Sequence, residues 1–233
     1  AQSLYGYMLL KGIGVDMNAN LALNYIKLAA DQQYPPAINL YAEFLAAGKG
    51  MSANPAKALQ LFEKASSLGD SNATNNIGKM YQLGLGVSEK DEEKAVEYFY
   101  QSANEGNVMA MVNLGICYLE GKGVKEDQTK AFTLFDSAAK YNNKEAMIFV
   151  GICKENGSGT KKNEKEAYEM YNKVADANNC AALYHKGRCL LEGIGVKKNV
   201  YKALKCCSRL IYFREKSSFK KKITKEKKLY NII

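Results

Sequence analysis

Pairs of glycines are the first residues of this chain whose type and spacing could bind a ligand. Six Gly-X-Gly triplets occur. Glycine-rich turns hold phosphates in nucleotide-binding proteins, but such a turn follows a strand and opens a helix. Each triplet here follows residues with the apolar spacing of a helix, so we predict that these glycines end helices and bind no nucleotide. The triplets begin at Gly12, Gly48, Gly84, Gly121, Gly157 and Gly193.

The remaining reactive side chains predict neither a metal centre nor a catalytic site. His185 is the only histidine, and nothing in the sequence selects a nucleophile and an acid to complete a catalytic triad around it. The six cysteines lack the spacing and partners of a zinc site. We therefore expect a protein without metal, cofactor or catalysis. The cysteines are Cys117, Cys153, Cys180, Cys189, Cys206 and Cys207.

Three of these cysteines are spaced like the glycine triplets. Cys117, Cys153 and Cys189 are 36 residues apart, so they occupy equivalent positions of a repeated unit. Equivalent atoms of stacked helix pairs lie about 10 Å apart, beyond the roughly 7 Å between Cα atoms that a disulfide tolerates. We predict buried thiols and a reducing compartment, the cytoplasm. Two glycosylation sequons, at Asn72 and Asn156, leave the endoplasmic-reticulum lumen or secretion as the alternative.

The glycines belong to a repeat that runs along most of the chain. Successive first glycines are 36, 36, 37, 36 and 36 residues apart, a period typical of solenoids. An alanine follows each of them at a nearly constant distance, at Ala22, Ala58, Ala95, Ala131, Ala167 and Ala203. The single longer step comes from one extra residue between Gly86 and Asp91.

The pattern within each copy predicts two helices joined by the glycine loop. In the fourth copy, apolar residues from Ala110 to Glu120 recur every three or four positions, and Gly121 ends that helix. Asp127 then caps a second helix, whose apolar face includes Ala131 and Phe135. The equivalent caps are Asn18, Asn54, Asp91, Asn163 and Asn199. Because one pair leaves an apolar side in water, neighbouring pairs must stack.

The fourth copy resembles a Sel1-like repeat, a relative of the tetratricopeptide repeat. The matching residues are Ala110, Leu114, Gly115, Tyr118, Gly121, Lys122, Gly123, Val124, Asp127, Lys130, Ala131, Phe135, Ala138 and Ala139. The resemblance covers residues 1 to about 210 and implies an all-α, right-handed α/α superhelix of about six helix-turn-helix repeats. Residues 1–213 would form this solenoid. Its last repeat is degenerate, because Cys206 and Cys207 stand where aromatic residues are expected.

The resemblance implies a function in protein complexes. We expect a protein–protein interaction scaffold or adaptor that binds another protein or a peptide segment in its concave groove. One alternative is a regulatory or substrate-recruiting fragment of a larger enzyme or a membrane-linked complex, such as an endoplasmic-reticulum degradation assembly. Another is a secreted repeat hydrolase of the β-lactamase type, which the irregular cysteines disfavour.

First-helix positions outside the repeated core pattern are the candidate groove residues. Val112, Ile116, Ile148 and Ile152 would form an apolar strip flanked by asparagines that could bond to an extended peptide, or they pack against a neighbouring helix instead. The full set is Asn39, Asn75, Asn76, Lys79, Val112, Asn113, Ile116, Ile148, Ile152, Tyr184 and Arg188.

Charge is concentrated in the final segment, residues 214–233. The chain as a whole carries 33 basic and 24 acidic residues, a net charge of +9. The last segment contains Lys220, Lys221, Lys222, Lys225, Lys227 and Lys228. Because the run lacks interleaved aromatic residues and any base-reading motif, a solvated tail or a capping segment is favoured over contact with nucleic acid or an acidic membrane. No apolar stretch is long enough to cross a bilayer.

Overall fold

The computed structural model describes residues 1–176 and 179–209, which contain helices and loops and no strand. The helices are α1 (Gln2–Lys11), α2 (Ala19–Asp31), α3 (Pro35–Ala47), α4 (Pro55–Ser67), α5 (Ser71–Leu83), α6 (Glu92–Asn104), α7 (Val108–Glu120), α8 (Gln128–Lys140), α9 (Lys144–Asn156), α10 (Glu164–Val174) and α11 (Cys180–Glu192). Residues 200–209 are also helical. The predicted all-α repeat solenoid is confirmed.

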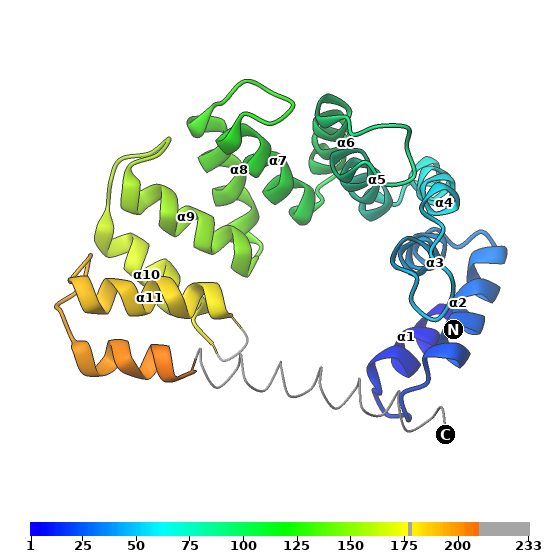
Figure 1. Cartoon of the computed structure of the whole chain (residues 1–233), viewed down its shortest axis with the longest axis horizontal. Helices are drawn as coiled ribbons and strands as arrows, with labels where there is room; N and C mark the ends of the chain where they lie inside the picture. The colour runs from blue at the N-terminus through cyan, green and yellow to red at the C-terminus, as the bar shows by residue number, and fades with distance from the viewer. Residues whose placement is uncertain (177–178, 210–233) are drawn as a thin grey trace. The chain divides into compact units, whose positions relative to one another are not determined.

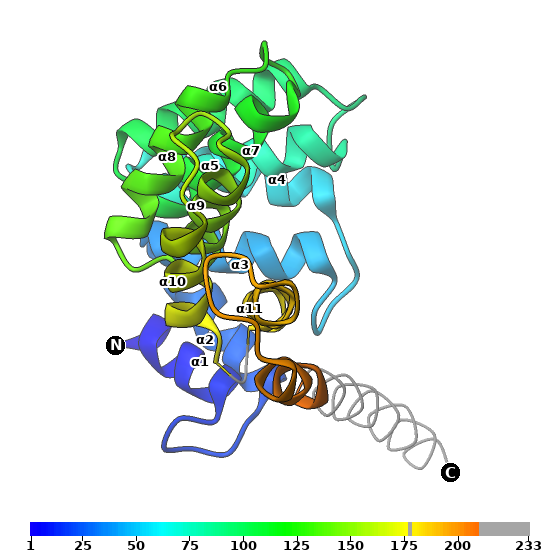
Figure 2. The same cartoon turned by 90° about the vertical axis from the view of Figure 1, so that its left-hand side faces the viewer.

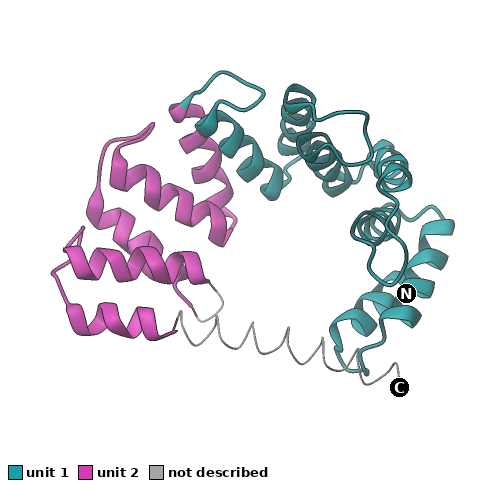
Figure 3. Cartoon of the chain, viewed as in Figure 1, with its two compact units in different colours: residues 1–127 teal, residues 128–233 magenta. Residues whose placement is uncertain are grey.

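The helices form two compact units (Figure 3). Unit 1 is Ala1–Asp127 and contains α1 to α7, and unit 2 begins at Gln128. Within unit 1, each first helix packs on the second helix of its repeat, and each second helix packs on the next first helix (Figure 1). In unit 2, α8 to α11 pack in the same consecutive order (Figures 1 and 2).

The first glycine of each triplet ends a first helix, as predicted. Gly121 follows α7 with φ 65° and ψ 30°, in the left-handed region, and its N–H donates to the carbonyl of Cys117. A left-handed residue with a side chain is strained, which explains why glycine recurs here. The predicted caps of the second helices are also confirmed where side-chain bonds are seen, at Asn18, Asn54, Asp91, Asn163 and Asn199.

Small residues on the first helices make room for bulky residues on the second helices. A Cβ atom added to Gly78 would lie 2.7 Å from the ring of Phe99, and one added to Gly151 would lie 2.5 Å from Tyr171. Both aromatic side chains are fully buried. In these helix pairs, as in α1 and α2 where Gly6 faces Ile26, a glycine of the first helix faces a large apolar side chain of the second.

In four of the six triplets the second glycine has a role that the sequence did not reveal, whereas at Gly50 the nearest atoms to an added Cβ lie 3.9 Å away. The four are Gly86, Gly123, Gly159 and Gly195. A Cβ atom on Gly123 would lie 2.0 Å from the carbonyl oxygen of Glu92, at the start of α6 in the preceding repeat. Gly159 meets Gln128 in the same way, and Gly195 meets Glu164, both at 1.9 Å. The loop of one repeat thus rests directly on the main chain of the previous second helix, so this glycine joins consecutive repeats.

Part of the expected C-terminal architecture is not described. The expected solenoid boundary at residue 213 and the basic segment with Lys220, Lys221, Lys222, Lys225, Lys227 and Lys228 lie outside the described residues. In the last described helix, Cys206 is buried and Cys207 is exposed. None of the described helices is both long enough and apolar enough to cross a membrane.

Candidate interaction surface

A polar hollow lies on the first helices of unit 1. Its volume is about 390 Å³, and side chains of α3, α5 and α7 line it. These side chains are mostly amides, with one acidic and one basic residue among them: Asn39, Glu43, Asn72, Asn75, Asn76, Lys79, Gln82, Leu83, Met109 and Asn113. Five of the predicted groove residues therefore come together here: Asn39, Asn75, Asn76, Lys79 and Asn113.

Asn76 is hydrogen-bonded to other side chains of this hollow. Asn76 donates from Nδ2 to Asn39 Oδ1 at 2.9 Å and to Glu43 Oε1 at 3.1 Å. Its Oδ1 accepts from Lys79 Nζ at 3.1 Å. Asn39 and Asn76 are both buried. The Asn76 amide uses both of its donors and one acceptor position within the protein, so this residue ties α3 to α5.

A second pair of amides, Asn75 and Asn113, is only half used, because each side chain uses one of its two polar groups in a hydrogen bond. Asn113 Nδ2 donates to Asn75 Oδ1 at 2.8 Å, which links α7 to α5. Among the described residues, Asn75 Nδ2 and Asn113 Oδ1 have no hydrogen-bond partner, and neither atom is among the buried unpaired ones. Asn75 is only 6% exposed and Asn113 is half-buried, but both line the hollow, so the pair presents one donor and one acceptor to it. A peptide group offers the complementary acceptor and donor.

An apolar hollow of about 340 Å³ adjoins the polar one. Its lining comes from the C-terminal ends of α3 and α5, from α4 and from the loop after α5: Glu43, Ala46, Ala47, Phe62, Asn76, Lys79, Met80, Leu83 and Leu85. Glu43, Asn76, Lys79 and Leu83 also line the polar hollow, so they form a rim common to both.

Two residues of the predicted apolar strip are not accessible, which corrects that prediction. Val112 is 0% exposed and Ile148 is 8% exposed. Asn39 and Asn75 hold the equivalent position in α3 and α5, and each bonds to an asparagine of the next first helix. The alternative, packing against a neighbouring helix, holds for Ile148, which clusters with Ala182 and Cys189 of α11.

The other two strip residues, Ile116 and Ile152, are half-buried. They belong to α7 and α9 and thus to different units.

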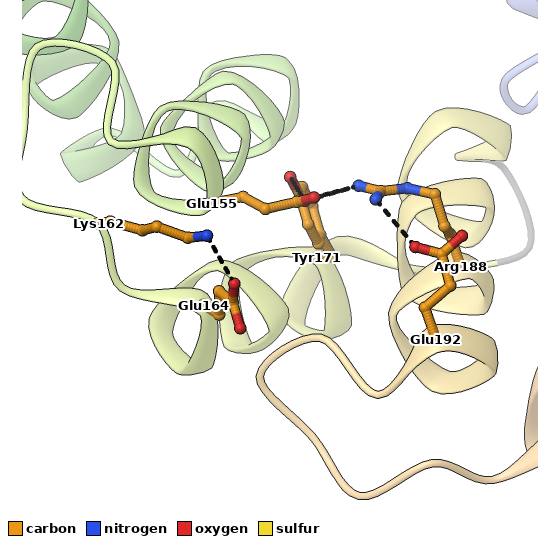
Figure 4. A network of polar contacts seen from close by, with 6 residues as sticks. All are labelled: Glu155, Lys162, Glu164, Tyr171, Arg188 and Glu192. Atoms are coloured by element: carbon orange, nitrogen blue, oxygen red, sulfur yellow. Dashed lines mark hydrogen bonds and ion pairs between the residues drawn. The ribbon is translucent and has the colours of Figure 1, made fainter.

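In unit 2, the predicted groove residue Arg188 is already paired. It bonds to Glu155 at 2.5 and 2.7 Å and lies 3.5 Å from Glu192 (Figure 4). The hydroxyl of Tyr171 donates to Glu155 at 3.0 Å. The bond to Glu155 raises the pKa of Arg188, and burial raises the pKa of Tyr171. The arrangement joins α9, α10 and α11 and leaves Arg188 little capacity for a partner.

The tyrosine at position 171 could have predicted this network from the sequence. Tyr171 stands where Ile26, Phe62, Phe99 and Phe135 stand in earlier copies. A tyrosine at a fully buried position needs a partner for its hydroxyl, so an acid or carbonyl within reach had to be expected. Near this site, Lys162 also pairs with Glu164 at 2.8 Å (Figure 4).

His185 packs beside the same network. Its ring stacks on Tyr171, with centroids 4.8 Å apart, and meets the exposed Tyr184 edge to face. Burial, followed by the charge of Arg188, lowers the pKa of His185. Nδ1 is buried and has no partner among the described residues. The side chain therefore serves the packing of α10 against α11 as a neutral ring.

The cysteines are all free, and Cys117, Cys153 and Cys189 are buried as predicted. Burial raises the pKa of each of these three thiols to about 11. Cys180 and Cys207 are exposed. Within residues 1–176 and 179–209, no three His, Cys, Asp or Glu side chains gather in a way that could hold a metal ion.

Solved structures with this fold include two bacterial proteins. The Sel1 repeat protein from Oxalobacter formigenes superposes with a TM-score of 0.77 at 27% identity, covering 90% of this chain and 83% of the other. The protective antigen c5321 of uropathogenic Escherichia coli gives a TM-score of 0.74 at 26% identity and covers 91% of this chain and 45% of the other.

Curated relatives match shorter stretches. The chain is 39% identical over 79 residues to the ERAD-associated E3 ubiquitin-protein ligase component HRD3B of Arabidopsis thaliana, covering 34% of this chain and 12% of the relative. It is 32% identical over 99 residues to protein sel-1 homolog 2 of Homo sapiens, covering 42% and 14%. The chain thus spans less than a sixth of the length of either relative.

The repeat assignment rests on the whole array. The model of the Sel1 repeat matches six times, at residues 1–34, 35–70, 71–107, 108–142, 144–179 and 180–210. These matches follow the helix pairs described above, each with its glycine loop. The chain belongs to the Sel1 repeat family.

Proposed function

We propose that this chain is a protein-interaction scaffold that holds an extended segment of a partner protein on the first-helix face of unit 1, without catalysis of its own. The observation that carries the proposal is the half-used amide pair Asn75 and Asn113 in the polar hollow. Extended peptides expose a donor and an acceptor that such amides can satisfy. Membership of a repeat family with stacked helix pairs supports a binding role.

Exposed apolar side chains at the polar hollow support a protein ligand. Leu83 and Met109 line it and are 63% and 44% exposed. An extended segment offers main-chain amides that the polar side chains can bind and side chains that the apolar residues can contact. Ile116 remains a proposed contact of unit 1, and Ile152 and Tyr184 remain proposed contacts of unit 2 taken by itself. We assign Arg188 to positioning, because Glu155 already occupies it.

A binding selection tests the proposal directly. A phage-displayed library of random dodecapeptides is selected on the full chain, and enriched peptides are measured by fluorescence anisotropy. We expect Asn113→Ala to weaken binding about tenfold, because it removes one hydrogen bond and unpairs Asn75. Asn24→Ala, an exposed site on α2, is the matched control and should bind as the wild type does. No enriched peptide, or equal binding by Asn113→Ala, would contradict the proposal.

A second proposal is that the chain belongs to a regulatory or recruiting component of a larger enzyme complex. The names of two relatives favour it: HRD3B is a component of a ubiquitin ligase, and another relative is chitin synthase regulatory factor 2 of Schizosaccharomyces pombe. Isolation of the full-length protein under mild conditions should then recover it with an enzyme subunit in fixed proportion. Recovery of the protein alone would contradict this second proposal.

The compartment also stays a proposal, with the cytoplasm as the first expectation and the endoplasmic-reticulum lumen or secretion as the alternative. Asn72 and Asn156, the acceptors of the two sequons, are both exposed. In a secretory compartment they would be available to the glycosylation machinery. A loss of mass when the native protein is treated with an N-glycosidase would favour the lumen, and an unchanged mass would favour the cytoplasm.

A further inference from the structure

We infer that a large apolar side chain of the bound partner segment enters the apolar hollow at the C-terminal ends of α3 and α5. The inference rests on the proposed function and specifies the partner's chemistry: an extended segment with an aliphatic or aromatic residue next to the peptide group that Asn75 and Asn113 bind. The reasons are the lining of the hollow, its position and its relation to the polar hollow.

The floor and walls of the hollow are apolar. Phe62 and Met80 are 2% and 4% exposed and form its floor, and Leu83 and Leu85 are exposed beside them. Ala46 and Ala47 contribute only methyl groups, so space remains between α3 and α5. A volume of about 340 Å³ is ample for one leucine or phenylalanine side chain. Covering such a surface removes apolar area from water and is favourable.

The common rim links this hollow to the amide pair. Glu43, Asn76 and Lys79 separate the two hollows, and the bonds of Asn76 hold all three in place. An extended peptide advances about 3.3 Å per residue and turns successive side chains to opposite faces. A segment crossing the rim can therefore leave one side chain in the apolar hollow while a neighbouring peptide group lies over Asn75 and Asn113.

The combination selects a peptide rather than a lipid or a detergent. An alkyl chain in the apolar hollow would gain nothing from Asn75 and Asn113, which line only the polar hollow, whereas an extended peptide can use both hollows at once. The rim carries one acid and one base, Glu43 and Lys79, so it gives no strong preference for a charged ligand. A peptide that places a main-chain amide beside an apolar side chain can bind in both hollows.

The test uses the full chain and the random dodecapeptide library. We expect enriched peptides to share one large apolar residue, and replacing that residue by alanine in the peptide should weaken binding about tenfold or more. On the protein, Ala47→Phe fills the hollow from an exposed position and should weaken binding to a similar extent. Ala19→Phe, at an exposed site on α2 outside both hollows, is the matched control.

A second variant protects the test against misfolding. Leu83→Ala removes a wall of the hollow without adding bulk, and circular dichroism checks that each variant keeps its helix content. Peptides that depend on Asn113 but share no apolar residue, or that bind Ala47→Phe and Leu83→Ala like the wild type, would overturn this inference and leave the proposed function intact. Peptides that are insensitive to Asn113→Ala would instead contradict the proposed function.

Discussion

The contact of the second glycine with the preceding repeat leads to a sharp stability prediction. In Gly123→Ala the new methyl carbon would lie 2.0 Å from the carbonyl oxygen of Glu92, so the loop or α6 must move by about 1 Å or more. The left-handed backbone, with φ 66°, adds strain for any residue with a Cβ atom. Strain costs about 1–2 kcal/mol and overpacking about 1–3 kcal/mol, so we expect a loss of roughly 2–5 kcal/mol.

Two control variants separate strain from the contact. Gly121→Ala changes the same loop at φ 65°, and the nearest atoms to its Cβ lie 3.6 Å away. Gly14→Ala changes the equivalent position of the first repeat, where only Met8 comes within 4 Å, at 3.9 Å. Both should lose only the strain, about 1–2 kcal/mol.

Urea unfolding followed by circular dichroism gives the free energies, and hydrogen exchange of the first turn of α6 locates the effect. Gly123→Ala should lower the urea midpoint more than either control and should speed exchange at Glu92 and its neighbours. If Gly123→Ala is no more destabilising than Gly121→Ala and Gly14→Ala, the glycine does not join the repeats as we describe.

Three further predictions concern unit 2 and the thiols. Near pH 8, Cys180 and Cys207 should react quickly with Ellman's reagent, whereas Cys117, Cys153 and Cys189 should react only on unfolding, because they are buried and their pKa values of about 11 keep them protonated. Since the pKa of His185 lies below its ordinary 6.5 in the folded chain, the unfolded chain takes up this proton first, so stability should begin to drop as the pH falls through 6.5. His185→Phe should reduce that drop, measured as the free energy of unfolding in urea at a series of pH values. An unchanged dependence of this free energy on pH would contradict the prediction. Arg188→Met should cost about 2 kcal/mol in urea unfolding, because it leaves the mostly buried Glu155 carboxylate without its cation, and Arg188→Met with Glu155→Gln should recover part of the loss.

The helices and their ends could be predicted from the sequence because local chemistry determines them. Gly121 and its equivalents end first helices through their own backbone freedom, and Asn18 and its equivalents cap second helices through their own side chains. The repetition of these signals also predicts the stacked fold.

The candidate site could be predicted only in outline, because it depends on contacts between repeats. Asn39 and Asn75 occupy equivalent positions, and each bonds to an asparagine of the next first helix, a contact that no single copy records. Likewise, Asn76 and Asn113 occupy equivalent positions in sequence, but the side chain of Asn76 makes three hydrogen bonds to its neighbours and that of Asn113 makes one. The contact of Gly123 with Glu92 is also invisible until two copies are placed together.

The one longer repeat shows where this architecture tolerates a change in chain length. The extra residue lies between Gly86 and Asp91, after the second glycine and before the cap. Gly86 still meets Pro55 of the previous repeat, and Asp91 still caps α6. An insertion at this point therefore lengthens only the surface loop and leaves the spacing of the helix pairs unchanged. Engineered sequences, such as an epitope or a tether, are best placed in these same few residues.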